Sequence, residues 1–421
     1  MALDRRQFLV RTGLTFAAAA LARAAAAPPV AAQSSDPVDW DAVRGLFALD
    51  PKWLHFGGLY LASHPRPVRE AIEQHRQGLD DNPVHYLHDH GPALEAAVLQ
   101  AATAYLGAQP TDIALTDSTT MGLGLLYHGL DLRPGQELIT TTHDFFATRE
   151  SVADAAARAG ARVTTITLYR DPATASVDEV VQALAQAVGP RTRVVALTWV
   201  HSGTGVKLPV AAIAALLRDA NAGRDQSERA LLCVDGVHGL GVEDAALADL
   251  GCDFFVAGCH KWLFGPRGTG LVWGNPRAWP AVGATIPSFS DTTTPGGAHT
   301  PGGFHSFEHR WALAAAFQLH LQLGKDRVLA RIHELNQQLK AGLATMAHVR
   351  LHTPLADELS AGLVCFEVAG LTPGQVVDRL RQAGIVATVT PYATAYARLA
   401  PGLLNSSAEV DQALAAVRAL A

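Results

Sequence analysis

Residues 231–268 read LLCVDGVHGLGVEDAALADLGCDFFVAGCHKWLFGPRG and contain two short apolar runs, at 231–234 and 254–257. Asp235 directly follows the first run, and Lys261 lies shortly beyond the second. Short apolar runs bounded by turn residues are typical of strands that are buried on both faces of a sheet. The stretch therefore predicts two strands of a covered sheet, with a carboxylate and an amine at or beyond their carboxyl ends.

The same alternation continues on both sides of this stretch. Apolar runs alternate with helical spacing along the chain, with runs at residues 112–115, 137–140, 162–167, 194–198 and 270–273 and helical stretches at 121–129, 147–159, 177–187 and 210–220. Strands that alternate with helices of about ten residues are typical of βαβ units around a mostly parallel sheet. The expected fold class is therefore α/β, with helices on both faces of the sheet and ligands bound beyond the carboxyl ends of the strands.

The flanks of this pattern differ from it. On the N-terminal side, apolar spacing predicts helices at 67–79 and 93–106, and a loop is expected between them at residues 82–90. After residues 283–306, a loop rich in Gly, Pro, Thr and His, the pattern predicts a smaller α+β unit. Its expected elements are a helix at 311–346, a strand at 362–368, a helix at 372–383, a strand at 386–389 and a last helix at 408–420.

Residues 1–32 have the composition of an export signal. The pair Arg5-Arg6 precedes an apolar stretch at 14–22, and small residues end at Ala32 in a cleavage-site pattern. A charged start, a short apolar stretch and such a site are typical of signal peptides, and the arginine pair indicates the twin-arginine route. We therefore expect the twin-arginine export machinery as a partner, cleavage near Ala32 and a periplasmic protein.

Composition excludes several classes of protein. The 421 residues are 49% hydrophobic and 17% charged, which excludes an intrinsically disordered chain. A formal charge of −6, without basic clusters beyond the N-terminus, argues against nucleic-acid binding. A membrane anchor at the N-terminus is disfavoured because Arg23 interrupts the apolar stretch, and we expect no membrane attachment after cleavage. Four Cys without a C-x-x-C pair indicate neither a zinc site nor a disulfide framework.

Three positions carry candidate chemistry, and each has a plain structural alternative. Asp235 could be an ordinary turn residue, Lys261 an exposed surface lysine, and the hydroxyl residues 118–120 an ordinary helix N-cap. The chain has only five Lys, however, and Lys261 lies in an apolar, glycine-containing run where burial lowers the pKa of an amine and makes it a nucleophile towards aldehydes. Together, an acid, an amine and a phosphate-binding helix start are the parts that a pyridoxal phosphate site requires.

The segment at 234–273 resembles fold-type I enzymes of the pyridoxal-phosphate-dependent class V aminotransferase family, most of all its isopenicillin N epimerase-like branch. The resemblance runs over most of residues 50–415. It implies pyridoxal 5'-phosphate as the cofactor, a homodimer and two domains. We therefore predict a leader at 1–32, an N-terminal segment at 33–65 that packs with the small domain, a large cofactor-binding domain at 66–305 and a small C-terminal domain at 306–421.

The resemblance also implies roles for individual residues. Lys261 is implied to carry the cofactor as an internal aldimine, Asp235 to pair with its pyridine nitrogen, and Arg398 to pair with the substrate carboxylate. Further cofactor contacts are implied at the phosphate for Thr119, Thr120 and His260, at the phenolic oxygen for Ser202 and His238, and on the ring face for Phe145.

Three departures from the family pattern change these expectations. Gly258 stands where many relatives have a phosphate-binding Ser, so that contact is missing. Residues 307–311, FEHRW, replace a Gly-Thr signature that reaches the neighbouring subunit's phosphate, and we expect Arg310 to provide a charged substitute. No Cys occurs in the loop before Arg398, where desulfurases hold their nucleophile, so sulfur abstraction through a persulfide is disfavoured.

These observations predict an exported enzyme that acts at the α-carbon of an amino acid or of an amino-acid-containing metabolite, as an aminotransferase or an epimerase. Alternatives are a C–S lyase or desulfurase-like enzyme and a non-catalytic periplasmic protein on the same fold. A nicotinamide-dependent oxidoreductase ranks last because no G-x-G-x-x-G follows the early strands. No metal site is expected, because the spacing of His85, His88 and His90 fits no common zinc pattern. The substrate, the amino acceptor and the choice among transamination, epimerisation, elimination and decarboxylation stay open.

Overall fold

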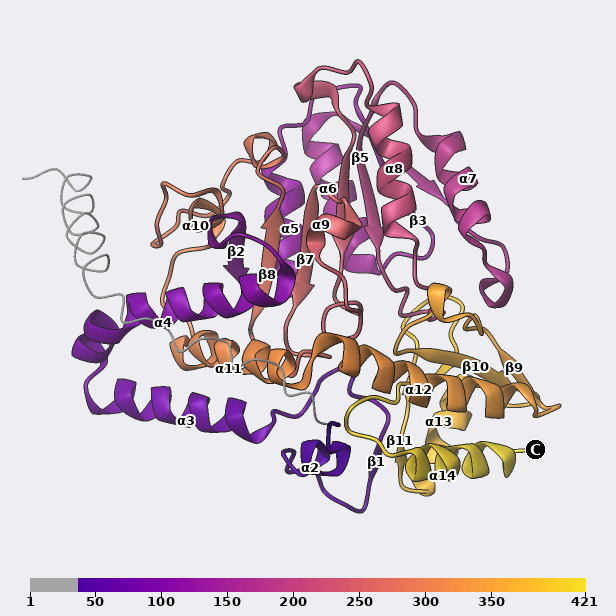
Figure 1. Ribbon diagram of the computed structural model, residues 1–421. Helices are drawn as coiled ribbons and strands as arrows, with labels where there is room; N and C mark the ends of the chain where they lie inside the picture. Colours follow the sequence, from indigo (N-terminus) through magenta and orange to yellow (C-terminus); the bar gives the residue numbers. More distant parts are fainter. Residues whose placement is uncertain (1–36) are drawn as a thin grey trace, which may run out of the picture.

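A seven-stranded sheet forms the centre of the molecule in the computed structural model, which describes residues 37–421 (Figure 1). Only β8 runs against the other strands, so the expected mostly parallel α/β sheet is confirmed. The predicted export signal at 1–32 lies outside the described residues, and no helix within them is long and apolar enough to cross a membrane. In sheet order the strands are β2 (Ile113–Thr116), β8 (Gly270–Gly274), β7 (Phe254–Gly258), β6 (Leu231–Asp235), β5 (Thr192–Thr198), β3 (Glu137–Thr141) and β4 (Arg162–Ile166).

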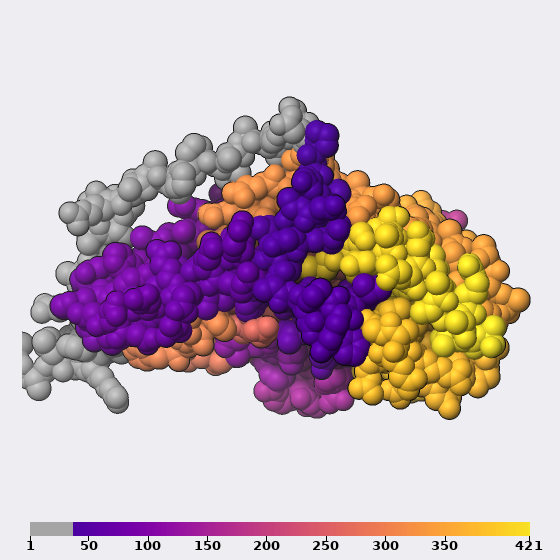
Figure 2. Space-filling view, turned by 90° about the horizontal axis from the view of Figure 1, so that it is seen from below, coloured from indigo at the N-terminus to yellow at the C-terminus, as the bar shows by residue number. Residues whose placement is uncertain are grey.

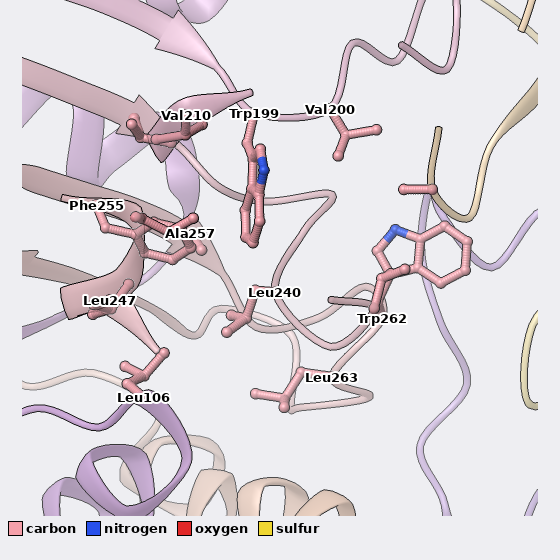
Figure 3. Close-up of a cluster of buried hydrophobic side chains, with 14 of the residues drawn as sticks. Leu106, Trp199, Val200, Val210, Leu240, Leu247, Phe255, Ala257, Trp262 and Leu263 are labelled. Carbon is pink, nitrogen blue, oxygen red and sulfur yellow. The ribbon is translucent and has the colours of Figure 1, made fainter. Parts of the chain in front are cut away.

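Two apolar cores lie on the two faces of this sheet, because successive side chains of a strand point in opposite directions. In β7, Phe254 and Val256 pack into the core under α5 and α6, whereas Phe255 and Ala257 face the core under α8 and α9. Figure 3 shows part of the second core, where Phe255 and Ala257 lie near Val210 of α8. The helices of this region are α2 (Trp40–Arg44), α3 (Arg66–Asp81), α4 (Pro83–Leu106), α5 (Thr119–Gly129), α6 (Phe146–Ala159), α7 (Val177–Ala187), α8 (Val210–Ala220), α9 (Leu247–Leu250), α10 (Pro295–His299) and α11 (Phe307–Leu323), the last of which packs against α3 and α4.

A smaller antiparallel sheet, ordered β12-β13-β10-β9, forms the C-terminal unit with three helices. The N-terminal segment joins this unit, because β1 pairs in parallel with β11 and Phe56 lies in the same apolar core. In Figure 2 the indigo N-terminal residues accordingly lie against the orange and yellow C-terminal surface. The elements are β1 (Leu54–His55), α12 (Lys325–Ala344), β9 (Val349–Leu351), β10 (Val364–Val368), α13 (Pro373–Gln382), β11 (Ile385–Val386), β12 (Thr388–Val389), β13 (Ala397–Leu399) and α14 (Ser407–Arg418).

Three expectations from the sequence are wrong in detail. Residues 82–90, predicted as a loop, are helical, because α4 begins directly after Asn82, whose side-chain oxygen caps the helix by accepting a backbone N–H of the first turn. The helix predicted at 311–346 is two helices, α11 and α12, which meet at Gly324, where φ is 89° and favours glycine. The strand predicted at 386–389 is divided between β11 and β12, which belong to different sheets.

Lys340 of α12 is buried in the C-terminal unit and holds the segment that follows β9. Its Nζ donates to the backbone oxygen of Leu355 at 3.0 Å and to Ser360 Oγ at 2.7 Å, and it lies 3.4 Å from Asp357 Oδ1. We expect Lys340→Ala to lower the free energy of unfolding by about 3 kcal/mol, because the oxygens lose their buried cation. Urea unfolding followed by circular dichroism measures this change. Lys52→Ala, at an exposed lysine, is the control and should stay within about 0.5 kcal/mol of the wild type; equal losses in the two variants would contradict the role of Lys340.

Candidate active site

Asp235 and Lys261 lie at the same edge of the central sheet. Asp235 is the last residue of β6, and its register partner in the parallel neighbour β7 is Val256. Lys261 follows the end of β7 in the adjoining turn. Asp235 is fully buried, and Lys261 keeps only part of its surface exposed. The carboxyl ends of two neighbouring strands thus bring the predicted acid and the predicted amine together.

The surroundings of the Lys261 amine favour its neutral form. Burial lowers the pKa of Lys261 to about 8; Asp235 opposes this change and Arg398 adds to it. Burial also holds the pKa of His238 well below its ordinary value, so the ring is neutral. Trp262 Nε1 donates to His238 Nδ1 at 3.2 Å, which places the ring hydrogen on Nε2, 3.4 Å from Lys261 Nζ. His238 is therefore oriented to donate to the lone pair of an unprotonated Lys261 amine.

The lowered pKa of Lys261 predicts an unusual pH dependence of its reactivity. In cofactor-free protein, the rate at which a trace of acetic anhydride acetylates Lys261 should rise with pH to half its maximum near pH 8, because only the unprotonated amine reacts. Competitive labelling read by mass spectrometry gives this midpoint, with a lysine peptide of ordinary pKa near 10.4 as the internal standard. A midpoint equal to that of the standard would show that burial does not act on Lys261 as described.

The turn between β2 and α5 supplies an anion-binding position beside this pair. Ser118 caps α5 by accepting a first-turn backbone N–H on its Oγ, and the helix begins at Thr119. Thr119 Oγ1 accepts the backbone N–H of Gly258, at the end of β7, at 2.8 Å. A Cβ added at Gly258 would lie 3.0 Å from Thr119 Oγ1 and 2.9 Å from His260 Cε1, so a larger residue has little space here. The helix N-terminus favours a phosphate at this turn.

The other predicted phosphate contacts differ in their surroundings. The buried Nδ1 of His260 has no hydrogen-bond partner among residues 37–421, which leaves it available to a ligand. Thr120 is exposed in the first turn of α5. Arg310, in the first turn of α11, is buried, with Asp117 Oδ1 at 3.8 Å and Glu95 Oε1 at 3.9 Å. Arg310 thus lies beside the residues that lead into α5, and its role at a neighbouring subunit's phosphate stays a prediction.

Ser202 and Phe145 are both close to a tyrosine that sequence patterns do not single out. Ser202 Oγ lies 2.8 Å from the hydroxyl of Tyr392, and the Phe145 ring lies 6.3 Å from the Tyr392 ring in an edge-on arrangement. Phe145 precedes α6, whereas Tyr392 comes from the loop between β12 and β13. The Ser202 hydroxyl, predicted at a cofactor oxygen, is thus bonded to Tyr392. The signal in the sequence is Tyr392 itself, an aromatic residue in the loop before Arg398.

Arg398 is a buried cation without an anionic partner in the described chain. It lies on β13 with 3% of its surface exposed. Its Nη1 donates to the backbone oxygen of Ser202 at 2.6 Å and its Nε to Thr388 Oγ1 at 3.0 Å. Burial lowers its pKa, and no carboxylate among residues 37–421 counters that effect. Because an unpaired buried charge is costly, this position is suited to an anionic ligand such as a substrate carboxylate.

These groups fit pyridoxal phosphate. Lys261 offers an amine to the aldehyde of the cofactor, while the start of α5, with Thr119 and His260, offers donors to its phosphate. Burial raises the pKa of Asp235 to about 6. Two effects oppose this rise: the backbone N–H of Val237 donates to Asp235 Oδ1 at 3.2 Å, and the charge of Lys261 favours the carboxylate. Asp235 is therefore ionised at neutral pH and suited to hold a proton on a ring nitrogen.

Comparison with known proteins agrees with this donor set. Residues 62–397 match the aminotransferase class-V family. The chain is 27% identical over 364 residues to isopenicillin N epimerase of Streptomyces clavuligerus, which covers 82% of this chain and 87% of that protein. It is 26% identical over 339 residues to a probable cysteine desulfurase of Vibrio cholerae, with 74% and 79% covered.

Solved structures share the fold at lower sequence identity. A cystine C–S lyase, in complex with its reaction product cysteine persulfide, has a TM-score of 0.80 at 24% identity and covers 89% of this chain and 99% of its own. A cysteine desulfurase from Thermococcus onnurineus has a TM-score of 0.80 at 20% identity and covers 92% and 99%. Both structures therefore share the fold of this chain.

Proposed function

The chain belongs to the aminotransferase class-V family of pyridoxal-phosphate-dependent enzymes, and we propose that it acts at the α-carbon of an amino acid or of an amino-acid-containing metabolite, by transamination or epimerisation. The observation that carries the proposal is the position of the Lys261 amine, with its pKa lowered to about 8, beside the buried Asp235 and Arg398. The family supports transamination, and the similarity to isopenicillin N epimerase supports epimerisation.

Each residue of the site has a distinct task in such a reaction. Bound pyridoxal phosphate supplies an aldehyde that binds amines and a ring that withdraws electrons from the α-carbon. Lys261 would hold the cofactor through its amine and, as the base of the site, would remove and return the proton at the α-carbon of the substrate. Asp235 would keep a proton on the ring nitrogen of the cofactor, and Phe145 would lie on the face of the ring. Arg398 binds the substrate carboxylate and thereby orients the bonds of the α-carbon.

An absorbance spectrum of the purified protein tests the proposal. With pyridoxal phosphate we expect a visible band that borohydride abolishes. After this reduction the cofactor should be recovered covalently bound to Lys261. If an added amino acid converts the band to that of the amine form of the cofactor, transamination is the reaction. Product formed with an unchanged resting band indicates epimerisation, elimination or decarboxylation. The absence of a band after addition of the cofactor would overturn the proposed function.

A C–S lyase or desulfurase-like reaction is the alternative, because probable cysteine desulfurases and a cystine C–S lyase are among the similar proteins. The loop before Arg398 contains no Cys. Cys365 is fully buried in β10, and burial raises the pKa of its thiol to about 12. A persulfide on this thiol is therefore disfavoured. Release of sulfide from cysteine, or of cysteine persulfide from cystine, by the purified enzyme, at a rate above that for alanine turnover, would support the alternative.

We also propose export to the periplasm by the twin-arginine route, on the basis of Arg5, Arg6 and the small residues that end at Ala32. N-terminal sequencing of the protein isolated from a periplasmic extract should give a first residue close to Gln33. Protein recovered only from the cytosol with its leader intact would contradict export.

A homodimer is the assembly that we propose, with residues 283–306, which include α10, at the interface. This segment presents Phe289, before α10, and Phe304, after it, which are 73% and 84% exposed and whose rings lie 6.5 Å apart. Large apolar side chains that are this exposed are typical of a surface that another protein covers. Sedimentation equilibrium should give twice the mass of the chain, and replacement of both Phe residues with Ser should shift the equilibrium towards the monomer.

A further inference from the structure

Tyr392 connects the two domains at the site. It belongs to the loop at 390–396 of the C-terminal unit, whereas Ser202, whose Oγ lies 2.8 Å from the Tyr392 hydroxyl, follows β5 of the large domain. The Tyr392 ring also covers Gly203, where an added Cβ would lie 3.0 Å from two ring carbons. The Phe145 ring is 6.3 Å away. The phenol is therefore placed over the same edge of the sheet as the candidate cofactor site.

The hydroxyl pair formed by Tyr392 and Ser202 retains one hydrogen that its own bond does not use. Each hydroxyl has one O–H, and whichever of the two oxygens donates, the other keeps an O–H for a third group. No other side-chain or backbone acceptor among residues 37–421 is bonded to either hydroxyl. Burial raises the pKa of Tyr392 to about 12, so the phenol stays neutral and able to donate at physiological pH.

Arg398 has unused donors next to this pair. Two of its five N–H groups are bonded, to Thr388 Oγ1 and to the backbone oxygen of Ser202, which leaves three. Ser202 therefore contacts both groups: its backbone oxygen accepts from Arg398 and its side chain is bonded to Tyr392. A free O–H and free guanidinium N–H groups thus lie around one residue, with no carboxylate of the described chain to accept them.

We propose that Tyr392 is a substrate-positioning residue whose hydroxyl pair with Ser202 completes, beside Arg398, the site for the substrate carboxylate. The two oxygens of a carboxylate accept several hydrogen bonds, so they can take the guanidinium N–H groups and the remaining hydroxyl together. This inference rests on the proposed function for its substrate class. It predicts that Tyr392 contributes to the preference of the site for amino acids over amines that lack a carboxylate.

A pair of probes that differ only in the carboxylate tests this role. L-phenylalanine and 2-phenylethylamine are titrated into the holoenzyme, and the change in the visible band gives the dissociation constant of each. Tyr392→Phe removes one hydroxyl and keeps the ring. We expect this variant to raise the dissociation constant of L-phenylalanine about tenfold or more, as for a lost hydrogen bond to a charged group. The dissociation constant of 2-phenylethylamine should stay within about twofold of the wild-type value.

Tyr396→Phe is the matched control, because Tyr396 lies in the same loop and its ring stacks on His352 with centroids 3.9 Å apart. We expect this variant to bind both probes as the wild type does. An equal loss for the two probes in Tyr392→Phe, the absence of any loss, or the same loss in Tyr396→Phe overturns the proposal. So does a wild-type enzyme that binds its cofactor but does not prefer the acid over the amine. A wild-type protein that forms no visible band refutes the proposed function itself, which is a separate outcome.

Discussion

Lys261→Ala is expected to abolish covalent attachment of pyridoxal phosphate and to lower turnover of any amino acid substrate by about 10⁴-fold or more. The alanine side chain neither binds the aldehyde nor carries a proton at the α-carbon. Arg398 cannot replace the lost amine, because a guanidinium stays protonated even though burial lowers its pKa. Absorbance and the mass of the borohydride-reduced protein measure the loss of attachment, and a rate assay measures the loss of turnover.

Two further experiments separate the chemistry of Lys261 from a role in folding. Lys261→Arg keeps a positive charge of similar reach and should lose turnover as fully as the alanine variant, because arginine does not act as a base. Added methylamine should restore part of the turnover of Lys261→Ala, because a free amine can enter the space and take the proton. Undiminished turnover in Lys261→Ala would remove Lys261 from the proposed reaction, whereas full biological function of this variant without turnover would support a non-catalytic protein on the same fold.

Asp235→Asn should lower turnover by about 10²–10³-fold while the cofactor still attaches to Lys261. The amide keeps the shape of the side chain but not the charge that holds a proton on the ring nitrogen. Asp235 is 2% exposed, so water does not screen the loss. Rate measurements together with the visible band distinguish slow chemistry from weak cofactor binding.

Asp249→Asn provides the comparison for this change, because Asp249 is an exposed acid on α9. Turnover by the Asp249→Asn variant should equal that of the wild type. Wild-type turnover in Asp235→Asn, with the cofactor attached, would remove Asp235 from the proposed reaction.

Most of the large domain follows from local patterns. The helices predicted at 177–187 and 210–220 coincide with α7 and α8, because their apolar spacing is regular and uninterrupted. The loop prediction for residues 82–90 is wrong because an Asn followed by Pro occurs at helix starts as well as in turns, and Pro is tolerated in the first turn of a helix. The division of 311–346 depends on a single residue, Gly324, within an otherwise helical pattern.

Local sequence patterns suffice to predict the α/β class, the strand ends next to Asp235 and Lys261, and the helix start at Thr119. Apolar periodicity and capping residues act over a few positions, so they are visible in the chain without the fold. Which groups meet between the central-sheet region and the C-terminal unit follows only from the three-dimensional packing. Tyr392 and Ser202 are 190 positions apart, and Arg398 and Ser202 are 196 apart. No local pattern encodes such contacts, because they exist only once β13 and the loop before it have packed against the end of β5.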